Sequence, residues 1–155
     1  MEQAVIDSPL GAIQIEARDG AITRLRWTRD PVDTDPPTPG SLLERAAEQL
    51  AEYFAGERDD FDLPVSPVGT DFQRAVWDAM IAIPKGGYRT YGDVAGELGA
   101  SARSVGTACG ANPIPILIPC HRVLSSTGLG GFSGAGGVET KVALLRLEGA
   151  ASLLI

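Results

Sequence analysis

A proline-containing segment, residues 59–68, separates two parts of the chain whose hydrophobic patterns differ. Before it, apolar and polar residues alternate at 12–17 and apolar residues recur at 22–27, as in half-buried strands. Asp19-Gly20 lies between these runs and is typical of a hairpin turn. After the segment, the apolar residues recur at helical spacing. The pattern predicts an α+β protein with strands first and helices second.

The helices can be placed from their N-terminal caps. Ser41 and Glu44 have the spacing of a capping box and open an amphipathic helix that Gly56 is placed to end. Thr70 and Gln73 repeat the box at the start of the helical part. The helix that follows carries the apolar side chains of Phe72, Val76, Trp77 and Met80.

Two shorter helices are expected next, over 91–98 and from Ser101 to about residue 111. Thr90 and Ser101 are their predicted caps, and Gly99 turns the chain between them. Such a pair is typical of a helix-turn-helix, although two packed helices more often have no DNA-binding role.

Composition limits the function classes. The net charge is −7, which by itself argues against nucleic-acid binding. The acidity is uneven, because residues 1–70 hold 14 acidic and 6 basic residues, whereas residues 71–155 hold 6 acidic and 7 basic ones. No run of about 18 apolar residues is present to span a membrane, and no secretory signal is visible. Two cysteines and one histidine exclude a disulfide scaffold and a multi-cysteine or His-rich metal site.

The candidate catalytic residues are Cys120 and His121, which are adjacent in the sequence and follow an apolar run bracketed by prolines. A cysteine attacks only as its thiolate, so it needs a nearby base or positive charge. Adjacent side chains rarely face each other directly, so a water between imidazole and thiol is plausible, with a carboxylate to orient the ring. For a bare Cys-His pair, the alternative is a buried structural cysteine beside a surface histidine.

The surrounding residues decide between these interpretations. Ile-Pro-Cys-His-Arg-Val at 118–123 resembles the active-site signature of the O6-alkylguanine-DNA alkyltransferases, also called methylated-DNA–protein-cysteine methyltransferases. Further matching segments are Asn112–Ile116, Tyr91, Ala102–Gly106, Gly131–Gly134, Leu144-Leu145 and Glu148-Gly149, and weaker similarity extends to Ser8–Gly11 and Phe72–Trp77. The resemblance therefore covers nearly the whole chain.

The resemblance implies an N-terminal ribonuclease-H-like antiparallel sheet with a helix, residues 1–65, and a C-terminal helical domain with a helix-turn-helix, residues 66–155. It implies a cytoplasmic, monomeric DNA repair protein. Such proteins move the alkyl group of O6-alkylguanine, and often of O4-alkylthymine, irreversibly onto a cysteine. The partner is double-stranded DNA containing the lesion, and no cofactor, metal or membrane is involved.

Catalytic roles follow from the matching positions. Cys120 would attack the alkyl carbon, His121 would take the thiol proton through a water, and Glu148 would orient His121. Tyr91 would contact the lesion phosphate and help to protonate the departing guanine. Asn112 would tie the helix-turn-helix to the active-site segment.

The remaining roles concern DNA and the extruded base. Arg103 would fill the gap that the base leaves in the stack, with small residues around it in the minor groove, namely Ala102, Ser104 and Gly106. Good packing is the alternative reason for those small residues. The base pocket would be lined by Val123, Phe132 and Ser133. Cys109 matches no family role and is expected to be a small core thiol.

The chain departs from the family pattern at several places. Phe132 stands where many members have tyrosine, Gly110 stands where some have arginine, and two turns are short. The sequence also argues against other function classes. A non-transferring lesion-binding protein would lack Cys120, a fused transcription regulator would need more residues, and a thiol hydrolase would need an oxyanion hole for which no motif is present.

Overall fold

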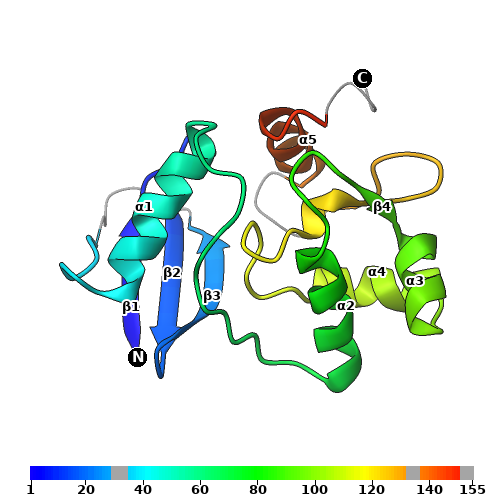
Figure 1. Cartoon of the computed structure of the whole chain (residues 1–155), viewed down its shortest axis with the longest axis horizontal. Helices are drawn as coiled ribbons and strands as arrows, with labels where there is room; N and C mark the ends of the chain where they lie inside the picture. The colour runs from blue at the N-terminus through cyan, green and yellow to red at the C-terminus, as the bar shows by residue number, and fades with distance from the viewer. Residues whose placement is uncertain (29–34, 132–136, 151–155) are drawn as a thin grey trace. The chain divides into compact units, whose positions relative to one another are not determined.

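The computed structural model describes residues 1–28, 35–131 and 137–150. The chain forms two compact units, Met1–Val68 and Gly69–Ile155. Among the described residues, the first unit contains three strands and one helix, and the second contains four helices, a short 3₁₀ helix and two very short strands (Figure 1). Among the described helices, none has the length and apolar character needed to cross a membrane.

The first unit is built on a three-stranded antiparallel sheet in the order β1-β2-β3. The strands are β1 (Glu2–Ile6), β2 (Ile13–Arg18) and β3 (Ala21–Trp27). The predicted hairpin between β2 and β3 is confirmed, since Asp19 and Gly20 both have positive φ, 53° and 78°. Strand β1 was not predicted from the sequence.

Helix α1 (Leu42–Phe54) packs against all three strands through its buried side chains (Figure 1). The predicted cap is only partly correct. Ser41 accepts a hydrogen bond from the Glu44 backbone N–H, but the Glu44 carboxylate accepts from Gly40 rather than from Ser41. Gly56 follows the helix with φ 77°, as expected for its C-terminus.

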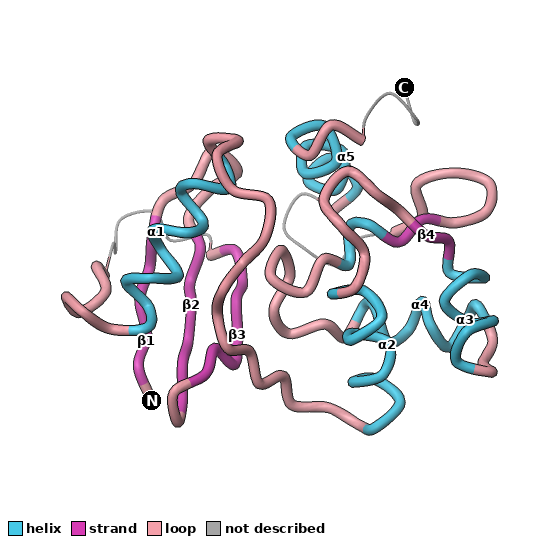
Figure 2. Tube along the Cα trace, in the orientation of Figure 1, coloured by secondary structure: helices cyan, strands magenta, loops and turns pink. Residues whose placement is uncertain are grey.

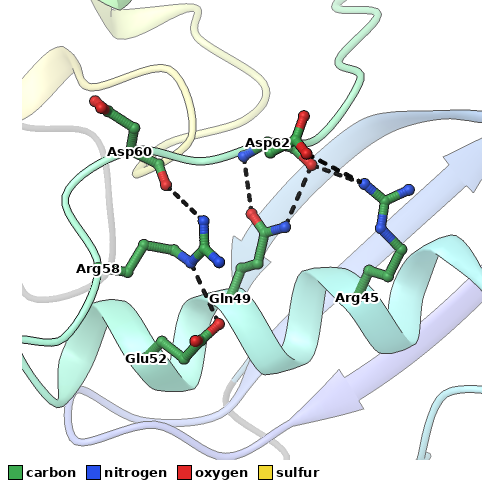
Figure 3. Close-up of polar contacts among 6 residues, drawn as sticks. All are labelled: Arg45, Gln49, Glu52, Arg58, Asp60 and Asp62. Carbon is green, nitrogen blue, oxygen red and sulfur yellow. Dashed lines mark hydrogen bonds and ion pairs between the residues drawn. The ribbon is translucent and has the colours of Figure 1, made fainter.

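The segment after α1 is held along the helix by polar contacts (Figure 3). The Gln49 amide bonds both backbone groups of Asp62, at 2.9 and 3.3 Å, and Arg45 donates to the same carbonyl at 2.9 Å. Further along, Val65 pairs with Ile22 of β3. The segment predicted as a linker is therefore anchored to the first unit over much of its length.

The second unit begins with α2 (Asp71–Ile81), whose predicted Thr70–Gln73 capping box is confirmed. Val76, Trp77 and Met80 are buried as expected, whereas Phe72 is partly exposed. Helices α3 (Tyr91–Leu98) and α4 (Ala102–Gly110) follow, with Gly99 left-handed at φ 65° and Ser101 capping α4. Figure 2 shows the short turn between them, so the expected helix pair is confirmed.

The rest of the second unit consists of η1 (Cys120–Arg122), β5 (Val123–Leu124) and α5 (Val138–Leu147). Strand β5 pairs in parallel with β4 (Arg89–Thr90), directly before α3. This pairing was not predicted, and it brings the start of α3 beside the residues that follow Cys120.

Candidate functional site

The run before Cys120 is fixed by the side chain of Asn112. Its amide donates to the Ile118 carbonyl at 2.8 Å, and its oxygen accepts from the Ile114 backbone N–H at 3.0 Å. Ile116, within the turn so closed, has φ 75°, an uncommon conformation for a β-branched residue. The turn leads to Cys120, the first residue of η1, whose side chain is buried.

Before it reacts, the Cys120 side chain is a protonated thiol. Burial raises its pKa, and the Asn112 amide and the nearby Lys141 ammonium act in the opposite direction. Burial is the largest of these effects, so the thiolate forms only when its proton is taken by a base.

His121 is fully buried and faces Glu148. Its Nε2 lies 2.7 Å from Glu148 Oε2, and because a carboxylate only accepts, Nε2 carries the proton. Nδ1 is then the basic nitrogen, and no described residue hydrogen-bonds to it. Burial lowers the pKa of His121 although Glu148 raises it, so the ring is neutral at ordinary pH. The structure thus presents a neutral imidazole with a free lone pair.

Arg122 completes this arrangement and was not assigned a role from the sequence. Its guanidinium donates to both Glu148 oxygens at 2.9 Å and to the Ile83 carbonyl at 2.6 Å. The buried carboxylate is therefore balanced by one full positive charge while it orients the imidazole.

Tyr91, the first residue of α3, is brought to the site by the β4–β5 pairing. Gly130 packs so closely on its ring that a Cβ there would lie 2.9 Å from Tyr91 Cε2. Burial and the neighbouring cysteines raise the pKa of Tyr91, so its hydroxyl keeps its proton and can donate it.

Lys141 on α5 is a second residue that sequence reasoning missed. It is fully buried, and its ammonium donates to the Val123 carbonyl at 2.7 Å and to the Gly131 carbonyl at 3.0 Å. The helical spacing of Lys141, Leu144, Leu145 and Glu148 places them on one face of α5, which is the signal that could have found it.

The predicted base pocket is seen only in part. Val123 is buried next to Cys120, whereas Phe132 and Ser133 lie outside the described residues. Cys109 is a buried free thiol whose sulfur lies 3.6 Å from Met80 Sδ, which confirms it as a core residue.

Of the predicted DNA-contacting residues, Tyr91 lies at the Cys120 site, whereas the other four form a separate group on α4. Ala102 and Arg103 are exposed, Ser104 and Gly106 are partly exposed, and a Cβ on Gly106 would meet open space. Arg103 lines a cavity of about 400 Å³ together with Phe72, Gln73, Ser101, Ser104 and Thr107 of α2 and α4. The Arg103 guanidinium makes no hydrogen bond or ion pair with any residue that the structure describes.

The fold and the site together define a protein with a helix-turn-helix and one buried cysteine beside a His–Glu–Arg cluster. In the described ranges, no three His, Cys, Asp or Glu side chains gather as metal ligands would. The chemistry that the site offers is that of a thiol with an adjacent base and a protonated phenol.

Comparisons with known proteins give the family. Residues 71–150 match the family described as 6-O-methylguanine DNA methyltransferase, DNA binding domain, and residues 1–67 match its ribonuclease-like domain. The chain therefore belongs to the 6-O-methylguanine DNA methyltransferase family. The matches also confirm the predicted α+β fold with a ribonuclease-like N-terminal part.

Individual relatives agree along nearly the whole chain. A methylated-DNA–protein-cysteine methyltransferase of Mycobacterium bovis is 45% identical, covering 92% of this chain and 89% of the relative. One from Bacillus subtilis is 40% identical and covers 92% of each chain. A crystal structure of the Mycobacterium tuberculosis protein OGT in complex with DNA has a TM-score of 0.83 at 41% identity, covering 96% of this chain and 93% of that one.

Proposed function

We propose that this protein repairs O6-alkylguanine in DNA by transferring the alkyl group irreversibly to Cys120. The observation that carries the proposal is the buried Cys120 beside the His121–Glu148 pair, in a chain of this family. It is a transferase used once, because a thioether has no route back to a thiol at this site. The alternative, a protein that only marks the lesion for other repair systems, has no use for such an activated thiol.

The reaction begins with the neutral His121. Its Nδ1 accepts the Cys120 proton through a bridging water, and Glu148 stabilises the imidazolium that forms. The thiolate then attacks the alkyl carbon, so that the S–C bond forms as the C–O bond to guanine breaks. Tyr91 donates a proton to the departing guanine, which leaves as the normal base. The Tyr91 phenolate then takes a proton from solvent and the His121 imidazolium returns one to it, so that the proton lost by the thiol is balanced by the one gained by guanine.

A duplex hides the alkyl carbon, so the base must be rotated out of the stack before Cys120 can reach it. We assign the DNA contact to α4, where Arg103 fills the gap and the small side chains of Ala102, Ser104 and Gly106 let the helix approach the minor groove. Asn112 connects this helix to the Cys120 segment through its bond to Ile118. In the pocket, Val123, Phe132 and Ser133 would contact the rotated base.

We further propose the roles of the two domains and the cellular location of the protein. Residues 66–155 hold the DNA-binding and acceptor groups, and residues 1–65 form the ribonuclease-like domain. Both cysteines are free thiols, which suits a monomer in the cytoplasm, where thiols stay reduced.

The activity is tested by incubating the protein with a duplex that contains O6-methylguanine. We expect intact and peptide mass analysis to show one methyl group per protein, on the peptide holding Cys120. Repeated turnover, or methyl on another residue, would contradict the proposal.

Replacing Arg103 by alanine is expected to slow repair in duplex DNA at least tenfold more than in single strands, because only the duplex leaves a gap to be filled. Single-turnover transfer on both substrates gives the comparison. Arg146→Ala, which removes an exposed arginine from α5, is the matched control for lost charge. Equal losses on the two substrates would show that Arg103 does not fill the gap.

DNA affinity is expected to fall only shallowly with salt, as for roughly 2–4 phosphate contacts. Two of the seven basic residues in 71–155, Arg122 and Lys141, are buried, and Arg89 is paired with Glu97. Few basic side chains are therefore left to displace counterions from the DNA. Binding of one duplex measured across a range of salt concentrations gives the slope, and a slope of about 6 or more would contradict this expectation.

A further inference from the structure

Lysine is rare in this chain, and one of its two copies is fully buried. Eleven of the 13 basic residues are arginines, and the two lysines are Lys85 and Lys141. Lys141 is 0% exposed, although a buried ammonium group loses its hydration and is tolerated only where other groups replace it.

The groups that replace water around Lys141 come from both ends of one segment. Its Nζ donates to Val123 at 2.7 Å and to Gly131 at 3.0 Å, so the lysine closes residues 123–131 into a loop. Within this loop Gly130 packs on Tyr91, and Lys141 Nζ itself lies 5.8 Å from the centre of the Tyr91 ring. Lys141 therefore holds in place both the backbone that follows Cys120 and the glycine backbone that packs beside the Tyr91 ring.

The positive charge of Lys141 also interacts electrostatically with Cys120. No described carboxylate pairs with it. The titratable groups that interact with it are Cys120, Cys109, the Tyr91 ring and His121. Burial lowers the pKa of Lys141 to about 8, and the two thiols oppose this by favouring the charged form. Below that pH the ammonium is charged and favours a thiolate at Cys120.

We propose that Lys141 is a positioning residue for alkyl transfer, holding the Val123 and Gly131 carbonyls beside Tyr91 and supplying the charge that stabilises the Cys120 thiolate as it forms. The proposal rests on the proposed function and extends it, because the reaction needs a thiolate in a site whose burial disfavours one. His121 removes the proton, and Lys141 makes the resulting anion less unfavourable.

The test uses full-length protein with Cys109→Ala, so that Cys120 is the only thiol. The reaction of Cys120 with iodoacetamide is followed against pH, and single-turnover transfer is measured on an O6-methylguanine duplex. At pH 7, where the Lys141 ammonium of the parent is charged, Lys141→Met should slow the alkylation of Cys120 about tenfold and lower transfer about tenfold or more, since a tenfold change in thiolate corresponds to one pKa unit. Lys85→Met should change neither.

Lys141→Arg separates charge from packing. It should keep the alkylation rate at pH 7 within about threefold of the parent and lower transfer less than Lys141→Met, because the guanidinium keeps the charge but is a larger, planar donor. If near-ultraviolet circular dichroism shows that Lys141→Met is unfolded, Lys141→Gln replaces it, which keeps a donor for Val123 without the charge. An unchanged alkylation rate at pH 7 in the neutral variant overturns the proposal, whatever its transfer rate. Failure of the Cys109→Ala parent to transfer would instead contradict the proposed function, and the alkylation profile would still test Lys141.

Discussion

Replacing Cys120 by alanine is expected to abolish methyl transfer completely while DNA binding persists. No other described side chain next to His121 is a soft nucleophile, and the exposed α4 surface that is proposed to bind DNA does not include Cys120. The cavity left by the sulfur is small, so the variant should remain folded. Mass analysis after incubation with an O6-methylguanine duplex measures transfer, and a gel-shift or fluorescence titration with the same duplex measures binding.

Cys109→Ala is the matched control for Cys120→Ala. Both cysteines are buried, but Cys109 contacts Met80 in the core, and burial raises the pKa of its thiol to about 12. We therefore expect Cys109→Ala to transfer one methyl group per protein like the parent. A methyl group on Cys109 in the Cys120→Ala variant would show that the second thiol can also act as an acceptor.

Short local sequence patterns were enough to predict most of the fold. The hairpin at Asp19-Gly20, the Thr70–Gln73 capping box and the Gly99 turn depend on a few adjacent residues, and all are present in the structure. Strand β1 was missed because two successive residues, Ala4 and Val5, are buried, so the side chains do not alternate. Strands β4 and β5 have two residues each, too few to show any period, and they form through pairing between distant parts of the chain.

The residues of the candidate site likewise divide into those that the sequence indicated and those that it did not. Cys120 and His121 are adjacent and belong to a recognisable segment, so the sequence was enough to select them. Arg122 was in the same segment, but its role depends on Glu148, 26 residues away, and on the Ile83 carbonyl, 39 residues away. Lys141 likewise acts on carbonyls that only the folded chain brings to it. The helical spacing of Lys141 with Leu144, Leu145 and Glu148 could have placed it on the buried face of its helix, but the identity of its carbonyl partners leaves no local pattern in a single sequence.

The His121–Glu148–Arg122 cluster gives the second large expected effect. Glu148→Gln should lower the transfer rate about 10²- to 10⁴-fold, the usual contribution of a positioned base. The amide has no charge to stabilise the imidazolium that forms at His121. It also leaves the buried Arg122 without its counter-ion, which should lower the free energy of unfolding by about 3–5 kcal/mol. Single-turnover transfer and urea unfolding measure the two effects.

The pH dependence distinguishes this role of Glu148 from a loss of folding alone. Glu148 is the group that raises the pKa of His121, whereas burial and Arg122 lower it, so in Glu148→Gln that pKa falls further. The ring then stays neutral over an even wider range, and raising the pH through the ordinary histidine range should not restore the rate. Glu139→Gln, an exposed glutamate in the first turn of the same helix, should transfer like the parent and lose at most about 1 kcal/mol of stability. If Glu148→Gln is destabilised but transfers at the parental rate where it is folded, Glu148 stabilises the fold through Arg122 and takes no part in activating Cys120.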